Sequence, residues 1–228
     1  MLKSYVIRTG RFTPAQKKAY DTLADKYIIP FSLEQLDFFK TFGNTAGVTL
    51  EIGFGSGFAT AGIAEANPGK NYLGVEVHRP GIGRLLWEID NRSLCNIRII
   101  EYDAVQVTEK MIPAGSLEAV HIFFPDPWPK KKHRKRRLMQ RPFTDILTAG
   151  LAPGGYLYMV TDWEDYAVHA LEELTATAGI VNKYEDFAPP QPWRPVTNFE
   201  KKGLAKEHVI KELFFVKSLE GTCYVTNN

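Results

Sequence analysis

The sequence predicts an α/β protein built on one mostly parallel, doubly wound sheet with a late antiparallel strand. Three observations support this fold class. Short apolar runs alternate with helical segments from Val48 onward, a glycine-rich stretch follows the first run directly, and an acidic residue follows several of the later runs. Repeated units of strand and helix with apolar strands are typical of a parallel sheet that helices cover on both faces.

Length and composition indicate one domain with flanking segments. The 228 residues suffice for one large core, and contents of 44% hydrophobic and 24% charged residues are ordinary for a globular protein. We expect an N-terminal arm over residues 1–31, partly disordered until a partner orders it, and an α/β domain over residues 32–217. Residues 218–228 form a C-terminal tail to which the sequence assigns no role.

Two helix-start signals precede the first predicted strand. Thr13-Pro14-Ala15-Gln16 combines a capping threonine, a proline in the first turn and a glutamine that can bond back to the cap. The helix that it opens should be short and weakly apolar. Ser32-Leu33-Glu34-Gln35 repeats the capping pattern, and Leu33, Leu36 and Phe39 predict a helical stripe that docks on the core.

The elements of the domain follow from the apolar runs and their spacing. A helix after Pro80 is predicted because four apolar residues share one face at helical spacing: Ile82, Leu85, Leu86 and Ile89. The predicted strands are Val48–Ile52, Tyr72–Val77, Ile97–Tyr102, Ala119–Phe124, Tyr156–Thr161 and, late in the chain, Lys211–Lys217.

A glycine or an acidic residue stands at the end of each of the first five predicted strands: Gly53, Glu76, Asp103, Asp126 and Asp162. In an open α/β sheet, ligands bind beyond the carboxyl ends of the strands, near the point where the strand order reverses. Any one of these acids is explained as well by helix capping. Together they predict a ligand site at one rim of the sheet.

The glycine-rich stretch is Glu51-Ile52-Gly53-Phe54-Gly55-Ser56-Gly57. Glycines at alternate positions let the backbone pass close to a ligand, although a tight turn without a ligand is the alternative. The nicotinamide fingerprint G-x-G-x-x-G requires glycine or alanine where Phe58 stands, which disfavours that cofactor. Glu76 lies about twenty residues beyond the loop, where such folds place a carboxylate on ribose hydroxyls. Asp103 would then reach an adenine edge.

The stretch Phe124-Pro125-Asp126-Pro127-Trp128-Pro129 holds one carboxylate between two prolines, which stop the strand and stiffen the turn. Seven of the next eight residues, Lys130 to Arg137, are Lys or Arg, and the eighth is His133. The whole chain carries only +2, so the remainder is net acidic and the excess of positive charge is local. A fixed acid, an indole and this cationic run favour a base carried on a polyanion. A proline-rich turn followed by a solvated loop is the alternative.

These motifs together resemble those of the bacterial-type tRNA (guanine-N7)-methyltransferases, which are class I S-adenosylmethionine-dependent methyltransferases. The resemblance covers roughly residues 8–217, and the matching segments are Glu51–Gly57, Gly74–His78, Phe124–His133, Val160–Asp162 and Arg194–Glu200. It implies a Rossmann-like methyltransferase fold, S-adenosyl-L-methionine as cofactor, and methyl transfer to N7 of a guanosine in the variable loop of tRNA.

The resemblance also implies roles for individual residues. Asp126 would be the catalytic residue, and Trp128 either stacks on a base or supports the turn. The implied cofactor-binding residues are Glu51, Gly53, Gly55, Gly57, Glu76, Asp103 and Asp126. The implied substrate-binding residues are Lys130, Asp162, Thr197, Asn198, Phe199 and Glu200, although Thr197 and Glu200 also fit a capping pair. Phosphate contacts are expected from Lys131, Lys132, His133, Arg134, Lys135, Arg136 and Arg137.

Three other functions remain open on the sequence. A methyltransferase acting on an exocyclic amine of a base also favours an acid in a proline turn, but here only Pro127 follows the acid before Trp128. A nicotinamide oxidoreductase is disfavoured by Phe58. A non-catalytic RNA-binding module would leave the glycine loop without a use.

The remaining features concern compartment and partners. Cys95 and Cys223 lie far apart and make no metal or redox spacing, which predicts no metal site and fits a reducing compartment. The N-terminus lacks a long apolar core, and no run approaches the length of a membrane span. We therefore expect a cytoplasmic protein, with a nuclear address in the basic run as the alternative. The sequence does not distinguish a monomer from a homodimer.

Overall fold

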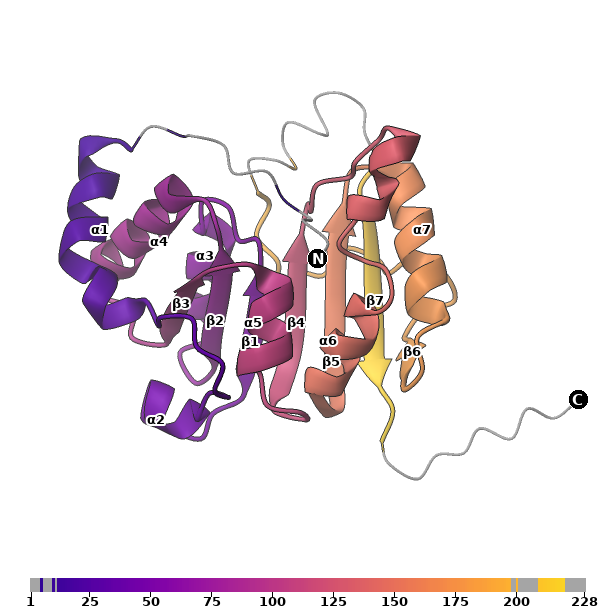
Figure 1. The fold of residues 1–228 in the computed structure, drawn as a ribbon, viewed down its shortest axis with the longest axis horizontal. Helices are drawn as coiled ribbons and strands as arrows, with labels where there is room; N and C mark the ends of the chain where they lie inside the picture. The colour runs from indigo at the N-terminus through magenta and orange to yellow at the C-terminus, as the bar shows by residue number, and fades with distance from the viewer. Residues whose placement is uncertain (1–4, 6–9, 11, 198–199, 201–208, 220–228) are drawn as a thin grey trace, which may run out of the picture.

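The computed structural model describes residues 5, 10, 12–197, 200 and 209–219. Its seven-stranded sheet has the order β3-β2-β1-β4-β5-β7-β6, in which β1 to β5 are parallel and β7 runs antiparallel to both β5 and β6 (Figure 1). The strands are β1 Val48–Ile52, β2 Asn71–Glu76, β3 Ile97–Glu101, β4 Leu117–Phe123, β5 Leu151–Thr161, β6 Ile180–Asn182 and β7 Lys211–Lys217. The predicted fold class, including the late antiparallel strand, is confirmed.

Helices cover both faces of the sheet. On each face, a separate apolar core lies between the sheet and its helices. One core receives side chains from α5 (Ala104–Met111), α6 (Phe143–Gly150) and α7 (Glu164–Thr175). The other receives them from α1 (Pro14–Tyr27), α3 (Phe58–Ala66) and α4 (Arg79–Asn91). The short α2 (Phe38–Phe42) and the 3₁₀-helix η1 (Lys131–Arg136) complete the described elements. No helix in this described part of the chain has the length and apolar character that a bilayer crossing requires.

The helix predicted after Pro80 is α4, and its four predicted core residues are fully buried. Four predicted strands, those found as β1, β2, β3 and β7, are right to within one residue at each end. The fourth strand begins two residues earlier than predicted, and β5 begins at Leu151, because Leu151 already pairs with Leu117 ahead of a register shift that precedes Tyr156. The three-residue β6 was missed, since a strand this short carries no alternating pattern.

The first helix-start signal is confirmed, and the second is wrong. Thr13 and Gln16 form the predicted capping box of α1. The second helix begins at Phe38 instead, because Asp37 caps it by accepting a bond from the Lys40 N–H at 3.0 Å. Ser32 only closes a local turn with Glu34. Of the predicted stripe, Leu33 and Phe39 are 76% and 61% exposed, and only Leu36 packs against the core.

The helix α1 has fourteen residues, longer than the short helix expected, and it lies along α4 (Figure 1). Gly83 of α4 faces the Gln16 carbonyl and the Phe12 ring, so the two backbones approach closely. Residues 14–27 are thus packed on the domain. The division into an arm, a domain and a tail stays a prediction.

Replacing Gly83 with alanine is expected to destabilise the protein by about 1–2 kcal/mol, because overpacking outweighs the gain in helix propensity. The added Cβ would lie 2.8 Å from both the Gln16 carbonyl oxygen and a Phe12 ring carbon. Urea unfolding measures the change. Gly69→Ala is the matched control, since nothing lies within 4 Å of a Cβ there. Equal stability of the two variants would show that α1 does not press on α4.

Candidate functional site

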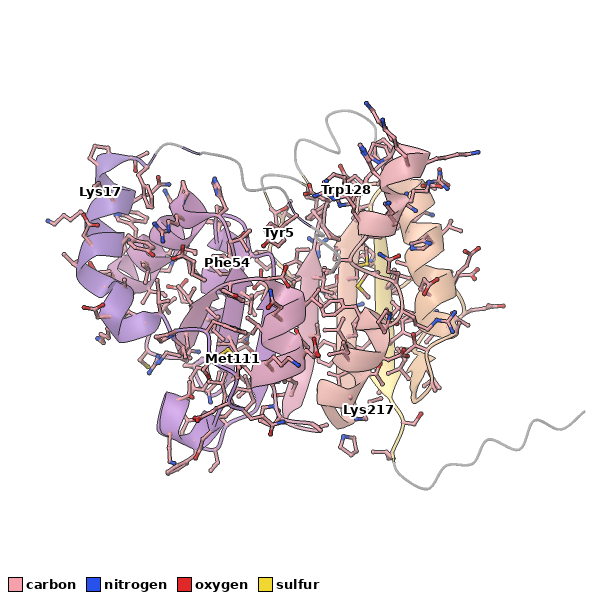
Figure 2. All side chains as sticks on the ribbon, viewed as in Figure 1. Tyr5, Lys17, Phe54, Met111, Trp128 and Lys217 are labelled. Carbon is pink, nitrogen blue, oxygen red and sulfur yellow. The ribbon has the colours of Figure 1, made fainter. Side chains whose placement is uncertain are left out.

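A cavity of about 360 Å³ opens at the carboxyl ends of the parallel strands. It lies where the strand order reverses between β1 and β4, which is the expected place for a ligand in this architecture. Figure 2 shows Tyr5 at this rim, between Phe54 and Trp128. The side chains and loops around the opening include Tyr5, Gly53, Glu76, Tyr102, Phe124 and Asp126. The glycine loop and the acidic turn, predicted to meet at one rim, therefore line the same cavity.

The glycine loop uses its three glycines in two ways. Gly53, Gly55 and Gly57 all have positive φ angles, of 71°, 59° and 68°. A Cβ at Gly53 or Gly55 would meet nothing within 4 Å, so the backbone there borders open space. A Cβ at Gly57 would lie 2.6 Å from Leu85 of α4. The first two glycines are thus available to a ligand, whereas Gly57 permits helix packing.

Glu76 ends β2 and lines the cavity with its carboxylate held by backbone groups. It accepts bonds from the N–H groups of Gly55 at 2.9 Å, Val77 at 2.7 Å and His78 at 3.0 Å. These bonds tie the glycine loop to β2. Because an ionised carboxylate has about four acceptor positions, Glu76 can still accept from a ligand hydroxyl.

Glu51 lies beneath the glycine loop, 2% exposed, and does not reach the cavity wall. Burial, with a contribution from the charge of Glu76, raises the pKa of the Glu51 carboxyl to about 7. The group lies close enough to Glu76 to sense its charge. Its predicted contact with a cofactor therefore requires access through the loop.

The stability of the protein should fall as pH rises from about 4.5 to about 7, because the native state keeps a proton on Glu51 that the unfolded state has released. Glu51→Gln is expected to remove this loss. The variant would match the wild type near pH 4.5 and exceed it at pH 8 by about 3 kcal/mol. Urea unfolding at both pH values, with the exposed Glu109→Gln as control, measures it. A variant that is less stable at pH 8 would contradict the assignment.

Asp103 is the N-cap of α5 and accepts a bond from the Gln106 N–H at 3.0 Å. The capping explanation that the sequence left open is therefore satisfied. Asp103 lies near Tyr5, a lining residue of the cavity, whose pKa is raised by burial and by the charges of Asp103 and Tyr102. Asp103 itself is 7% exposed and is not part of the cavity lining.

The turn that carries Asp126 is held in an uncommon conformation. Phe124 and Trp128 on either side of it have positive φ angles of 50° and 46°, which non-glycine residues rarely adopt. The Phe124 N–H donates to the Val160 carbonyl at 2.8 Å, and the Pro127 carbonyl accepts from Arg137 Nε at 3.0 Å. These anchors hold the exposed Asp126 at the cavity.

The basic segment, residues 130–137, is mostly but not wholly available to a polyanion. Lys130, Lys131, Lys132, Arg134 and Lys135 are exposed, and His133 and Arg136 are partly buried. Arg136 donates to the Tyr5 carbonyl at 2.8 Å and stacks over the Trp128 ring at 3.8 Å. This arrangement supports the hypothesis that Trp128 stabilises the turn, rather than the alternative that it stacks on a base.

Arg137 does not fit the predicted set of phosphate contacts. Its side chain is only 1% exposed, so a phosphate cannot reach it. It bonds to the Pro127 carbonyl, forms an ion pair with Asp165 of α7, and lies against the Tyr166 ring. Asp165 also pairs with Arg134 at 2.9 Å. Sequence reasoning gave Asp165 no role, since an acid in the first turn of a helix is ordinary.

Of the predicted substrate-binding residues, Lys130 lies in the exposed basic segment after β4, and the others follow β5 or precede β7. Asp162 follows β5 and is half-buried, while Asn198 and Phe199 lie outside the described residues. Thr197 and Glu200 form a capping box, in which the Glu200 N–H donates to Thr197 Oγ1 at 3.1 Å. Arg194, for which the sequence analysis predicts no role, binds both carboxylate oxygens of Glu200.

Comparisons with known proteins agree with this geometry. The family model described as "Putative methyltransferase" matches residues 45–213. A protein of Nitrosomonas eutropha named "tRNA (guanine-N(7)-)-methyltransferase" is 47% identical over 217 residues, covering 95% of this chain and 97% of its own. A protein of the same name from Burkholderia pseudomallei is 48% identical over 220 residues, covering 96% of this chain and 83% of its own.

Two solved structures show the same fold at low sequence identity. The antibiotic-resistance methyltransferase Kmr is 15% identical with a TM-score of 0.58, covering 85% of this chain and 96% of its own. A 16S rRNA adenine methyltransferase from Catenulisporales acidiphilia, solved with SAM as cosubstrate, is 14% identical with a TM-score of 0.55. It covers 82% of this chain and 94% of its own.

Proposed function

This chain belongs to the bacterial-type tRNA (guanine-N7)-methyltransferase family, and from that membership we propose that it methylates N7 of the guanosine at position 46 of the tRNA variable loop. The observation that carries the proposal is the single cavity that Gly53, Glu76 and Asp126 line together. A tRNA substrate supports our expectation that the enzyme is cytoplasmic.

The cavity suits S-adenosylmethionine by its size, its acceptors and its open backbone. Glu76 offers a carboxylate to ribose hydroxyls, and the backbone at Gly53 and Gly55 leaves room for the ligand. The apolar part of the cavity wall includes Ile52, Val75 and Leu138. When bound, this cofactor supplies an electrophilic methyl group on a sulfonium. Beyond the wall, Asp103 adds negative charge that favours a cationic ligand.

Guanine N7 carries an in-plane lone pair and no proton, so the reaction requires no strong general base. The main task of the protein is to align N7 with the methyl carbon and the sulfur. We assign Asp126 to this task because its turn is anchored on both sides at the cavity. Its carboxylate can accept bonds from the Watson–Crick donors of guanine and stabilise the positive charge that develops on the purine.

The exposed cations of the basic segment would bind tRNA phosphates, which gives affinity without base choice. Lys130, Lys131, Lys132, Arg134 and Lys135 are exposed beside the Asp126 turn. Arg136 and Arg137 instead support the turn itself. The tRNA would therefore meet an anchored turn with exposed cations next to it.

Replacing Lys130, Lys131 and Lys132 together with glutamine should weaken tRNA binding and lower the salt dependence. For three lost phosphate contacts, the slope of log K against log[salt] should fall by roughly 2–3. Filter binding from 50 to about 300 mM salt measures the slope. Lys40→Gln in α2, an exposed lysine away from the cavity, is the control. An unchanged slope in the triple variant would remove these lysines from the interface.

The proposed function is tested by methylating unmodified tRNA with labelled cofactor and mapping the product. We expect label only in N7-methylguanosine of the variable loop. This product carries a fixed charge and is cleaved after borohydride and aniline treatment, so it is distinguishable from an exocyclic methylamine. Label on an exocyclic nitrogen, or binding of tRNA without transfer, would overturn the proposal in favour of one of the alternatives.

A further inference from the structure

Arg194 is buried and bonds to side chains of β5, of β7 and of the turn at Thr197. Its Nε donates to Tyr158 Oη at 3.2 Å, and its Nη2 donates to Glu212 Oε1 at 2.8 Å. Two further bonds, at 2.5 and 2.9 Å, reach the two carboxylate oxygens of Glu200. Arg194, Glu200 and Glu212 are 8%, 7% and 2% exposed. This is the fork geometry that an arginine, but not a lysine, can provide.

The carboxylate of Glu200 is nearly saturated by groups of this chain. Besides the two bonds from Arg194, it accepts one from the Thr197 N–H at 3.4 Å. Three of about four acceptor positions are therefore occupied. Although burial acts against the charge, Arg194 lowers the pKa of the Glu200 carboxyl, so it stays ionised. Glu200 therefore has only about one acceptor position left for a contact with RNA. Thr197, at the same turn, is half-buried and so partly exposed to solvent.

The cluster and the segment of residues 191–197 contact elements that also carry the loops of the cavity. Glu212 of β7 pairs with Val160 of β5, whose carbonyl accepts the Phe124 N–H that anchors the Asp126 turn. Trp193 stacks on His121 of β4 with ring centroids 5.0 Å apart. Pro195 lies against Gly62 of α3, the helix that follows the glycine loop. The segment thus reaches from β7 to α3.

We propose that Arg194 is a positioning residue that, with Glu212 and Tyr158, fixes Glu200 and so holds Thr197 where the tRNA substrate meets it. Glu200 acts through the turn and does not touch the RNA. The inference rests on the proposed function, because it concerns how that substrate is held. It replaces the expectation that Glu200 binds substrate directly.

The test compares Arg194→Lys, Glu200→Gln and the double variant in steady-state methylation of tRNA and in titration with adenosylhomocysteine. We expect each single variant to raise the KM for tRNA on the order of tenfold, since both break the same bidentate pair. The double variant should be no worse than either single one. The Kd for adenosylhomocysteine should stay within about twofold of the wild type, because Arg194 does not line the cavity.

Direct contact between Glu200 and tRNA gives a different result. In that case Arg194→Lys, which keeps the Glu200 carboxylate, would bind tRNA nearly as well as the wild type, and the effects of the two changes would multiply. A merely structural role would lower kcat and the adenosylhomocysteine stoichiometry together, through loss of folded enzyme, with the KM unchanged. Either result overturns the inference.

Two further variants keep the test decisive. Arg84→Lys in α4 removes an arginine that donates two N–H groups to Glu88 outside the cavity, and it should leave the KM for tRNA unchanged. If Arg194→Lys does not fold, Glu212→Gln weakens the same cluster while keeping its shape, and it must raise the KM for tRNA. Product mapping on the wild type is done first, so failure of the proposed function shows there, independently of the variants.

Discussion

Replacing Asp126 with alanine is expected to lower kcat by about 10²–10³-fold, the effect typical of removing one group that stabilises developing charge. The side chain is exposed at the cavity, so its loss should change the free energy of unfolding by no more than about 0.5 kcal/mol. Single-turnover methylation of tRNA with saturating cofactor measures the chemical step. Asp90→Ala, at an exposed acid near the end of α4, is the control.

Asp126→Asn separates charge from shape in the same experiment. The amide keeps one acceptor for a guanine donor but cannot balance the cationic purine, so its rate should lie between those of wild type and Asp126→Ala. An increase in the Kd for adenosylhomocysteine would report the cofactor contact predicted for the same carboxylate. Near-normal turnover of the alanine variant would remove Asp126 from the mechanism.

Arg137→Ala is expected to cost about 2–3 kcal/mol of stability and to lower turnover as well. The change leaves a cavity beside Tyr166 and removes the donor to the Pro127 carbonyl, which would then lack a partner in a partly buried position. The lost ion pair adds little, because Asp165 is 43% exposed and water screens it. Urea unfolding and tRNA methylation measure the two effects.

Arg134→Ala is the matched comparison, because Arg134 pairs with the same Asp165 but is 43% exposed. It should change stability by less than about 1 kcal/mol and weaken tRNA binding instead. If Arg137→Ala kept its stability and lowered the salt dependence of tRNA binding, Arg137 would be a phosphate contact after all.

The rim of the site could be predicted from sequence because the carboxyl ends of parallel strands meet at one edge. Gly53, Glu76 and Asp126 are found at the cavity for this reason. Local capping patterns are less decisive. Thr13 caps a helix as expected, but Ser32 competes with Asp37 five residues later, and only packing decides between two good caps.

The burial of individual charges could not be predicted. From the sequence, all the cations of residues 130–137 are expected to be solvated. Arg137 is nevertheless buried, because it bonds to the Pro127 carbonyl and to Asp165, which local sequence patterns do not bring together. Arg194 illustrates the same limit, since its partners lie in β5, in β7 and at Glu200. Tyr5 reaches the cavity from the N-terminal segment, and no periodic pattern marks it.

The reversal of strand order between β1 and β4 makes two sets of loops face each other across one cavity. On the proposed function, the loops after β1 and β2 would hold the methyl donor, and the loop after β5 and the segment before β7 would meet the acceptor. The Asp126 turn after β4 would contact both. Changes confined to the loop after β5 and to the segment before β7 would then alter the choice of nucleic-acid target and leave the donor site intact.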